Sequence, residues 1–237
     1  MSDLPESQYA EFRDGLVELL PAMVAAAPIA LLYGAIATGK GLSPLEVTLS
    51  SALVFAGGAQ LAAIELWTVP VPIAALVLST VLINARYILM SASLAPKVAH
   101  LPFGARLLGF HALADENWAL AERRAASRRL TAAYFFGSGA VFWVNWVAWS
   151  WAGTVLGPLL GDPRRFGADF AFTAIFIGLV AGFLTTRRAG IVVVASAAAA
   201  TAAHLAFGSP WHVLAGAFAG MAAAVLAWRA DAEGEPA

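Results

Sequence analysis

Long apolar runs recur along the whole chain, and each is long enough to cross a membrane as a helix. A hydrocarbon core of about 30 Å needs roughly 17 or more apolar residues per helix. Runs of this kind occupy Leu16–Ala37, Leu45–Trp67, Val71–Leu94, Leu130–Leu156, Phe170–Thr186, Gly190–Phe207 and Trp211–Trp228. Charged residues make up 12% of the chain, about half the share typical of soluble domains. The sequence therefore predicts an all-α polytopic membrane protein.

The segments between these runs are short and rich in glycine, proline and charge, as in GKGLSP, VPVP and GDPRRFGAD. Such segments mark turns and leave no room for a soluble domain. With the shorter stretch Leu107–Glu122, the runs predict a bundle of about seven to eight transmembrane or part-membrane helices. We expect one transmembrane domain over 16–229, a cytoplasmic N-terminal segment over 1–15 and a C-terminal tail over 230–237.

The positions of arginine and lysine predict the orientation, because short cytoplasmic loops carry an excess of both. The densest cluster consists of Arg123, Arg124, Arg128 and Arg129, and we place this loop in the cytoplasm. Both termini are then cytoplasmic if Leu107–Glu122 crosses the membrane. If it does not cross, an early segment has to enter and return, and the glycine pair 57–58 is the expected position.

Three clusters of polar residues interrupt the apolar sequence, and each is a candidate for function. An ionisable group at membrane depth costs several kcal/mol unless it is paired or hydrated, so it defaults to a functional hypothesis. The clusters are Gly57, Gly58, Gln60 and Glu65; Asn84 and Arg86; and His111, Asp115, Glu116 and Asn117.

The glycine pair and Gln60 have two interpretations. A helix that breaks at Gly57–Gly58 frees backbone groups, which a membrane tolerates only where they line a cavity or are buried in protein. Secondary transporters build substrate sites from such broken helices. Alternatively, the glycines let two helices approach closely, and Gln60 bonds a neighbouring helix. We predict the break, with Gln60 facing a polar cavity near the membrane centre.

Arg86 lies inside a long apolar run and requires an anionic partner. The carboxylates nearest to it in sequence are those of Glu65, Asp115 and Glu116. Such a pair satisfies both charges at once, and it serves either structure or substrate binding. Together with Asn84, Arg86 is predicted to supply hydrogen-bond donors to the same cavity.

Asp115 and Glu116 are predicted to couple transport to protons. Consecutive side chains on a helix point about 100° apart, so the two carboxyls cannot face one cavity equally. We expect one to be turned inward and the other toward the interface. Burial raises the pKa of a carboxyl toward physiological pH, which makes the inward one the candidate proton carrier. Both carboxyls are ordinary surface groups if Leu107–Glu122 lies on the membrane surface.

A weak internal echo relates Glu46–Ala63 to Asp169–Thr186. Both segments start with an acidic residue, continue as an apolar run and carry glycines about a dozen residues in. Internal repeats are common in transporter folds, but apolar helices resemble one another easily. The echo leaves a true repeat possible without requiring it.

The same polar segments resemble a known family. SALVFAGGAQLAA, NARYILMSASLAPKVAHLP and ADENWALA occur in the order typical of AzlC-type branched-chain amino acid permeases, and ADFAFTAIFIGLVAG is similar to the family's later segment. The resemblance extends from about Leu16 to Trp228. Ala114 stands where the family often has threonine, and Tyr87 fits only loosely a position that is often aromatic or histidine. These departures leave the substrate open.

The resemblance implies a secondary-active exporter of branched-chain, neutral aliphatic amino acids in a bacterial inner membrane, driven by the proton motive force. It also implies a small AzlD-type membrane subunit as a partner. We predict no enzyme activity, cofactor or nucleic-acid partner. The chain has no cysteine for thiolate metal sites and no GxxxxGK[ST] loop for ATP, and no metal site is predicted. A membrane channel, or a transporter of another small solute, is the alternative.

Overall fold

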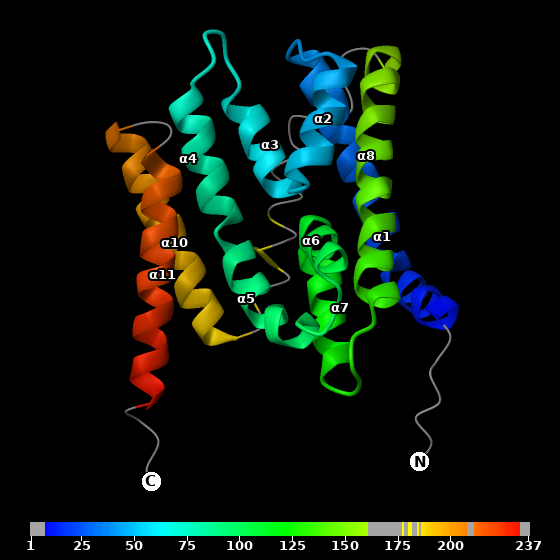
Figure 1. Cartoon of the computed structure of the whole chain (residues 1–237). Coiled ribbons are helices and arrows are strands. Elements are labelled where there is room, and N and C mark those ends of the chain that lie inside the picture. The colour runs from blue at the N-terminus through cyan, green and yellow to red at the C-terminus, as the bar shows by residue number, and fades with distance from the viewer. Residues whose placement is uncertain are drawn as a thin grey trace. The chain divides into compact units, whose positions relative to one another are not determined.

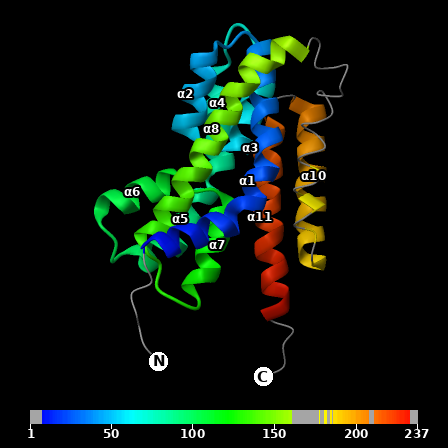
Figure 2. The ribbon, with the colours of Figure 1, turned by 90° about the vertical axis from the view of Figure 1, so that its right-hand side faces the viewer.

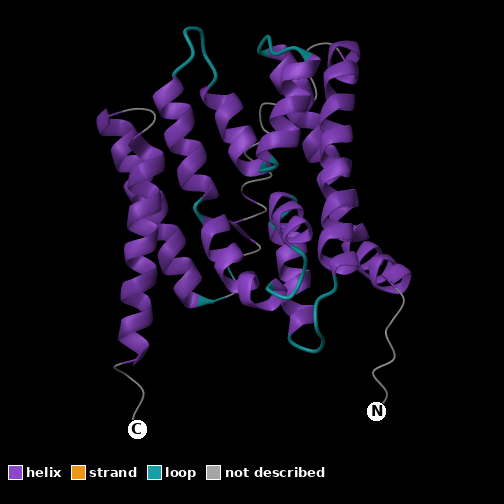
Figure 3. Cartoon of the chain, in the orientation of Figure 1, coloured by secondary structure: helices purple, strands orange, loops and turns teal. Residues whose placement is uncertain are grey.

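The structure is a computed structural model, and it describes residues 8–160, 186–207 and 211–232, with single positions at 177, 180, 181 and 184. These residues form helices joined by turns and loops (Figure 3), which confirms the predicted all-α class. The α-helices are α1 (Gln8–Gly39), α2 (Pro44–Val54), α3 (Gly57–Leu66), α4 (Ile73–Asn84), α5 (Arg86–Val98), α6 (Phe103–His111), α7 (Asp115–Ala125), α8 (Ser138–Leu156), α10 (Arg187–Phe207) and α11 (Trp211–Ala232). A π-helical turn, η1 (Ala133–Gly137), precedes α8, and a 3₁₀ turn, η2 (Gly157–Leu160), follows it. The predicted run Phe170–Thr186, and with it the second half of the internal echo, lies almost entirely outside the described residues.

Several helices have the length and composition of membrane spans. Among the described residues, Gln8–Gly39, Ile73–Val98 and Arg187–Phe207 are long and apolar enough to cross a membrane. The second of these comprises α4 and α5 in succession. Two predicted runs are divided in the structure, because Leu45–Trp67 forms α2 and α3, and Val71–Leu94 forms α4 and most of α5.

The chain forms two compact units. The first contains Met1–Trp67 and Ile83–Pro163, and the second contains Thr68–Leu82 and Arg164–Ala237. Figure 1 is coloured along the chain, with α1 to α3 in blue to cyan, α5 to α8 in green to yellow-green, and α10 and α11 in yellow to red. The single transmembrane domain over 16–229 stays a prediction.

Within the first unit, α1 and α8 lie side by side (Figure 2). Their backbones come closest at two glycines. A Cβ atom on Gly34 would stand 2.0 Å from the carbonyl oxygen of Ser150, and one on Gly153 would stand 2.1 Å from that of Leu31. Small residues permit this approach between membrane helices, so both positions require glycine.

The turn before α2 shows why that helix starts where it does. Ser43 and Glu46 form a capping box, in which the Ser43 amide donates to the Glu46 carboxylate at 2.7 Å and the Glu46 amide donates to Ser43 Oγ at 3.3 Å. Pro44 occupies the first helical position, where its missing N–H is not needed. The sequence LSPLE therefore specifies a helix start directly after the turn.

Within the second unit, α10 and α11 form an antiparallel helical pair (Figure 1). Ser196 Oγ on α10 donates to the Gly216 carbonyl on α11 at 2.9 Å. A Cβ atom on Gly216 would lie 3.1 Å from the Cβ of Ala200. Small side chains thus bring the two backbones close enough for a direct hydrogen bond.

Candidate functional site

The first polar cluster lies at a break between two short helices, as predicted. α2 ends at Val54, Phe55 adopts a left-handed conformation with φ 42° and ψ 49°, and α3 begins at Gly57. Such a φ is rare for a bulky residue and costs of order 1–3 kcal/mol, so the surroundings have to impose it. The break at Phe55 and Ala56 therefore lies directly before the glycine pair, in agreement with the predicted interruption at or next to Gly57–Gly58.

Core packing explains this position. The Phe55 side chain is buried and meets Phe142 of α8 edge to face, with ring centroids 6.0 Å apart. A Cβ atom on Gly57 would stand 2.6 Å from Cη2 of Trp146, also on α8. The left-handed residue directs the phenyl ring into the core, and glycine at 57 makes room for the indole.

At the end of α2, side chains from later helices donate hydrogen bonds to backbone carbonyls. The Ala52 carbonyl accepts hydrogen bonds from Trp143 Nε1 and His111 Nε2, each at 2.9 Å. The Phe55 carbonyl accepts one from the Tyr87 hydroxyl at 3.3 Å. Because freed backbone groups at membrane depth need partners, these contacts stabilise the break.

Gln60 does not face an open cavity, which corrects our prediction for its surroundings. Its side chain is 3% exposed. The amide donates to Ser51 Oγ at 3.2 Å and to Ser50 Oγ at 3.3 Å, and it accepts from Trp146 Nε1 at 3.0 Å. Gln60 thus joins α3 to α2 and α8 in this conformation, because three polar side chains converge on it. Its predicted role in substrate binding stays a prediction.

The second polar cluster lies at the short interruption between α4 and α5, which we count as the second break although Ala85 keeps right-handed helical dihedral angles, φ −54° and ψ −27°. α4 ends at Asn84, Ala85 lies between the helices, and α5 begins at Arg86. Arg86 Nη1 forms an ion pair with Asp115 Oδ2 at 2.7 Å, so the predicted carboxylate partner is confirmed as Asp115. Asn84 Oδ1 and Arg86 Nε are inaccessible to solvent and lack a hydrogen-bond partner among the described residues. These two buried atoms therefore have unused hydrogen-bonding capacity.

The third polar cluster lies at a further break, between α6 and α7. The stretch Leu107–Glu122 therefore does not cross the membrane as one helix. Asn117 satisfies backbone groups at this break. Its Oδ1 accepts a hydrogen bond from the Ala114 amide and its Nδ2 donates one to the Ala112 carbonyl, each at 2.7 Å. Asp115 then occupies the first turn of α7, where the helix dipole favours a carboxylate.

The three breaks are connected to one another by side-chain contacts. Tyr87 beside the second break bonds the Phe55 carbonyl of the first. Arg86 of the second pairs with Asp115 of the third. His111 at the third break bonds the Ala52 carbonyl at the end of α2. We refer to this closed set of contacts as the three-break junction.

Asp115 and Glu116 have different surroundings, as their spacing predicts. Asp115 is engaged by Arg86, and the two side chains are 42% and 39% exposed. Protein around the Glu116 carboxyl raises the pKa of Glu116 by desolvation, and the charge of Asp115 raises it further. The residue as a whole is nevertheless exposed. With its raised pKa, Glu116 binds a proton more readily than an ordinary glutamate.

The other sequence-predicted residues are placed as follows. Glu65 lies outside the junction, near the end of α3, where its backbone carbonyl accepts from Lys40 Nζ at 3.3 Å. Gly58 is in the first turn of α3. Among the described residues, no group of three His, Asp or Glu side chains is arranged to hold a metal ion.

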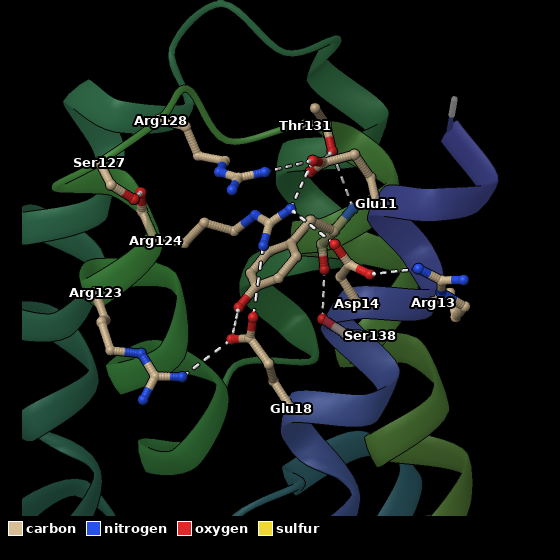
Figure 4. Close-up of polar contacts among 11 residues, drawn as sticks. Glu11, Arg13, Asp14, Glu18, Arg123, Arg124, Ser127, Arg128, Thr131 and Ser138 are labelled. Carbon is tan, nitrogen blue, oxygen red and sulfur yellow. Dashed lines mark hydrogen bonds and ion pairs between the residues drawn. The ribbon is translucent and has the colours of Figure 1, made fainter. Parts of the chain in front are cut away.

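A second charged cluster, which we did not predict, ties the start of α1 to α7 (Figure 4). Arg124 Nη2 meets Glu11 Oε1 at 2.6 Å, with side chains 7% and 3% exposed. Glu11 also accepts from Thr131 Oγ1 at 2.9 Å, and Glu18 accepts from the Tyr134 hydroxyl at 2.9 Å. We call this group of side chains the α1–α7 ion network.

The sequence contained a signal for this network. Glu11, Asp14 and Glu18 are spaced by three and four residues, which places them on one face of a helix. We began the first span at Leu16 and treated 1–15 as a separate segment, whereas α1 is helical from Gln8. An earlier helix start would have provided an acidic face as the partner of the arginine cluster that begins in the last turn of α7.

Comparison with known proteins gives consistent matches over most of the chain. The family model described as AzlC protein matches residues 21–160. An uncharacterized membrane protein of Archaeoglobus fulgidus is 30% identical over 221 residues, which cover 90% of this chain and 94% of that protein. Inner membrane protein YgaZ of Escherichia coli K12 is 27% identical over 233 residues, covering 94% of this chain and 93% of that protein. No solved structure shows significant similarity to the chain.

Proposed function

Because the chain belongs to the AzlC family, we propose that this membrane protein is a secondary-active transporter that exports branched-chain, neutral aliphatic amino acids. The observation that carries the proposal is the ion pair of Arg86 with Asp115 at the three-break junction. Broken helices that meet around charged side chains are how secondary transporters form substrate sites. An isolated structural ion pair does not require three helix breaks around it.

The junction offers complementary groups to a zwitterion. The guanidinium of Arg86 presents a planar fork of donors that fits a carboxylate. Its Nε lacks a partner among the described residues, as does the carbonyl oxygen of Asn84. A substrate carboxylate that binds Arg86 displaces Asp115, whose carboxylate is then free to accept the substrate ammonium. The ion pair thus holds the empty site in a neutral state.

Proton coupling is assigned to Glu116. Its raised pKa favours protonation at a higher pH than for an ordinary glutamate, and Glu116 adjoins the residue that the substrate displaces. A proton bound at Glu116 lowers the local negative charge when Asp115 is released from Arg86. Substrate and proton occupancy are linked by that electrostatic relation.

The partner and the location follow from the family resemblance. We propose a small AzlD-type membrane subunit that assembles with the chain in a bacterial inner membrane. The Escherichia coli relative is named an inner membrane protein, which supports the location, and the apolar candidate spans support a multi-pass arrangement.

The test is counterflow in proteoliposomes, with the chain purified alone and with a co-expressed small subunit. Valine, leucine and isoleucine should exchange, and a proton gradient should drive their net movement. A channel would equilibrate these solutes without counterflow accumulation. If another solute exchanges in either preparation and neutral aliphatic amino acids do not, the substrate assignment is wrong.

A further inference from the structure

A cavity of about 600 Å³ lies between the end of α5 and the loop that follows α7. Its charged lining residues are Lys97, Arg128 and Arg129, with His100 beside them, and no carboxylate lines it. The arginines belong to the cluster from which the sequence predicts a cytoplasmic loop. The cavity is separate from the three-break junction and from the α1–α7 ion network, although it shares Arg128 with the latter.

Hydrogen bonds at the cavity wall hold its shape. His100 Nε2–H donates to the Leu130 carbonyl at 2.8 Å, which fixes the end of α5 against the loop. Ser127 Oγ donates to the Arg124 carbonyl at 3.1 Å, and the Arg128 amide donates to the same carbonyl at 2.9 Å. The loop is thus folded back on α7.

Two of the cations are held by carboxylates outside the cavity. Lys97 Nζ pairs with Glu122 Oε2, and Arg128 Nη1 lies 3.9 Å from Glu11 Oε1 in the α1–α7 ion network (Figure 4). These pairings limit the freedom of the two side chains, which reduces the entropy that a ligand has to remove.

Arg129 differs from the other two cations of the cavity, because neither a helix end nor an ion pair among the described residues accounts for its charge. Lys97 lies in the last turn of α5, where a cation offsets the negative pole of the helix. Arg129 lies four residues beyond Ala125, the last residue of α7, and the dipole effect is confined to the last turn. Its side chain is exposed and has no ion pair in the part of the chain that the structure describes.

We propose that this cavity binds a phosphate group, carried by an anionic phospholipid headgroup or by a soluble phosphate. Basic pockets between helices on the cytoplasmic side suit such headgroups, and each basic residue near the membrane surface adds to the attraction. Arg129 is the primary contact, and Lys97 and Arg128 complete the site. Because Arg128 also faces Glu11, an occupied cavity competes with the α1–α7 ion network for one guanidinium.

The test measures binding of dihexanoyl-phosphatidylglycerol to the full chain in neutral detergent by isothermal titration calorimetry. Dihexanoyl-phosphatidylcholine, which has the same phosphate but no net charge, is the comparison lipid. We expect saturable binding of phosphatidylglycerol that is tighter than that of phosphatidylcholine. Arg129→Gln should weaken it about five-fold, the equivalent of about 1 kcal/mol. Ala126→Glu, which adds a carboxylate to the exposed lining, should weaken it further.

The matched control is Arg13→Gln. Arg13 carries the same charge on α1, is 63% exposed and pairs only locally with Asp14 among the described residues. It should leave binding unchanged. A second titration, in the presence of inorganic phosphate, separates the two sources. If inorganic phosphate competes with phosphatidylglycerol, a free phosphate is sufficient for binding. If it does not compete, the lipid is the ligand. Equal loss in Arg13→Gln and Arg129→Gln, or no loss in both Arg129→Gln and Ala126→Glu, overturns the proposal.

Discussion

Arg124 and Glu11 form a buried ion pair although 113 residues separate them in the chain. The atoms Arg124 Nη2 and Glu11 Oε1 lie 2.6 Å apart, and Arg124 also stacks over the Tyr134 ring, 4.2 Å from its centroid. The pair fixes the start of α1 against α7, so residues 8–15, which precede the first predicted span, belong to the folded core of the first unit.

This pair predicts a large stability loss when one charge is removed. Arg124→Gln removes the cation that lies 2.6 Å from the buried Glu11 carboxylate, which keeps its bond to Thr131 and the more distant Arg128 at 3.9 Å. Breaking a buried ion pair in this way costs about 3–5 kcal/mol. Thermal unfolding in detergent, followed by tryptophan fluorescence, should show a marked decrease in Tm. Glu11→Gln should lower Tm as well, and the double variant should lose less than the sum of the two single losses. Additive losses would show that the two charges are not coupled.

Arg86→Gln is expected to separate transport from stability. The Arg86 and Asp115 side chains are 39% and 42% exposed, and exposed ion pairs contribute about 0–1 kcal/mol. The variant should therefore keep its Tm within a few degrees while losing amino acid counterflow. Arg86→Lys should also weaken transport, because an ammonium does not reproduce the bidentate fork.

The control for this prediction is Arg13→Gln, which removes an arginine away from the junction. If counterflow and Tm of the Arg86 variants fall in proportion, the ion pair serves structure. Wild-type counterflow by a well-folded Arg86→Gln variant contradicts a role in binding.

Glu116 predicts a pH dependence of stability. Its pKa is raised in the folded chain, so the folded state binds more protons between the ordinary value of about 4.3 and the raised value. The contribution of Glu116 to the free energy of unfolding is therefore fully present below the ordinary pKa and is lost as pH rises through the raised pKa. The Tm of the wild type should fall relative to Glu116→Gln across this window. Parallel Tm curves for the two proteins would show that the pKa of Glu116 is not raised.

The same substitution tests proton coupling. Glu116→Gln should abolish export driven by a pH gradient and leave exchange, which needs no net proton movement. Glu65→Gln removes a carboxyl outside the junction and should leave both activities unchanged. Gradient-driven export by Glu116→Gln at the wild-type rate would assign the proton to another residue.

Gly57→Ala is expected to destabilise the break before α3. The added methyl would stand 2.6 Å from Trp146 Cη2, and overpacking of this kind costs about 1–3 kcal/mol. Gly104→Ala is the control, because no atom lies within 4 Å of a Cβ at that position. Chemical or thermal unfolding should distinguish the two variants, and equal Tm values would mean that the Trp146 ring moves aside freely.

The structure changes the expected effect of Gln60→Leu on stability. The sequence alone predicted loss of transport with normal folding. In the structure Gln60 bonds Ser51 and Trp146, and leaving such buried groups unpaired costs about 1–3 kcal/mol. We therefore expect a lower Tm for Gln60→Leu. An unchanged Tm with lost transport would instead support direct contact between Gln60 and substrate.

The sequence by itself determined the class of the protein and the position of the first helix interruption. Apolar runs predicted the spans, because a membrane selects residues by hydrophobicity over a length that the bilayer sets. The glycine pair and Gln60 marked the first break, because a membrane tolerates free backbone groups only where protein surrounds them or where they line a cavity. The other two polar clusters were predicted as functional positions, and the breaks beside them were not predicted. Each of these signals is local in the chain and can be recognised without knowledge of distant contacts.

Only the tertiary structure decided which polar residues contact one another. Asp115, and not Glu65 or Glu116, pairs with Arg86 because the break between α6 and α7 brings Asp115 to the start of α5. The first break falls at Phe55 because the Phe142 ring on α8 receives its side chain. Gln60 is occupied by Trp146 and two serines, and Glu11 by Arg124. These outcomes depend on contacts between residues far apart in sequence, and a pattern along one chain does not specify such contacts.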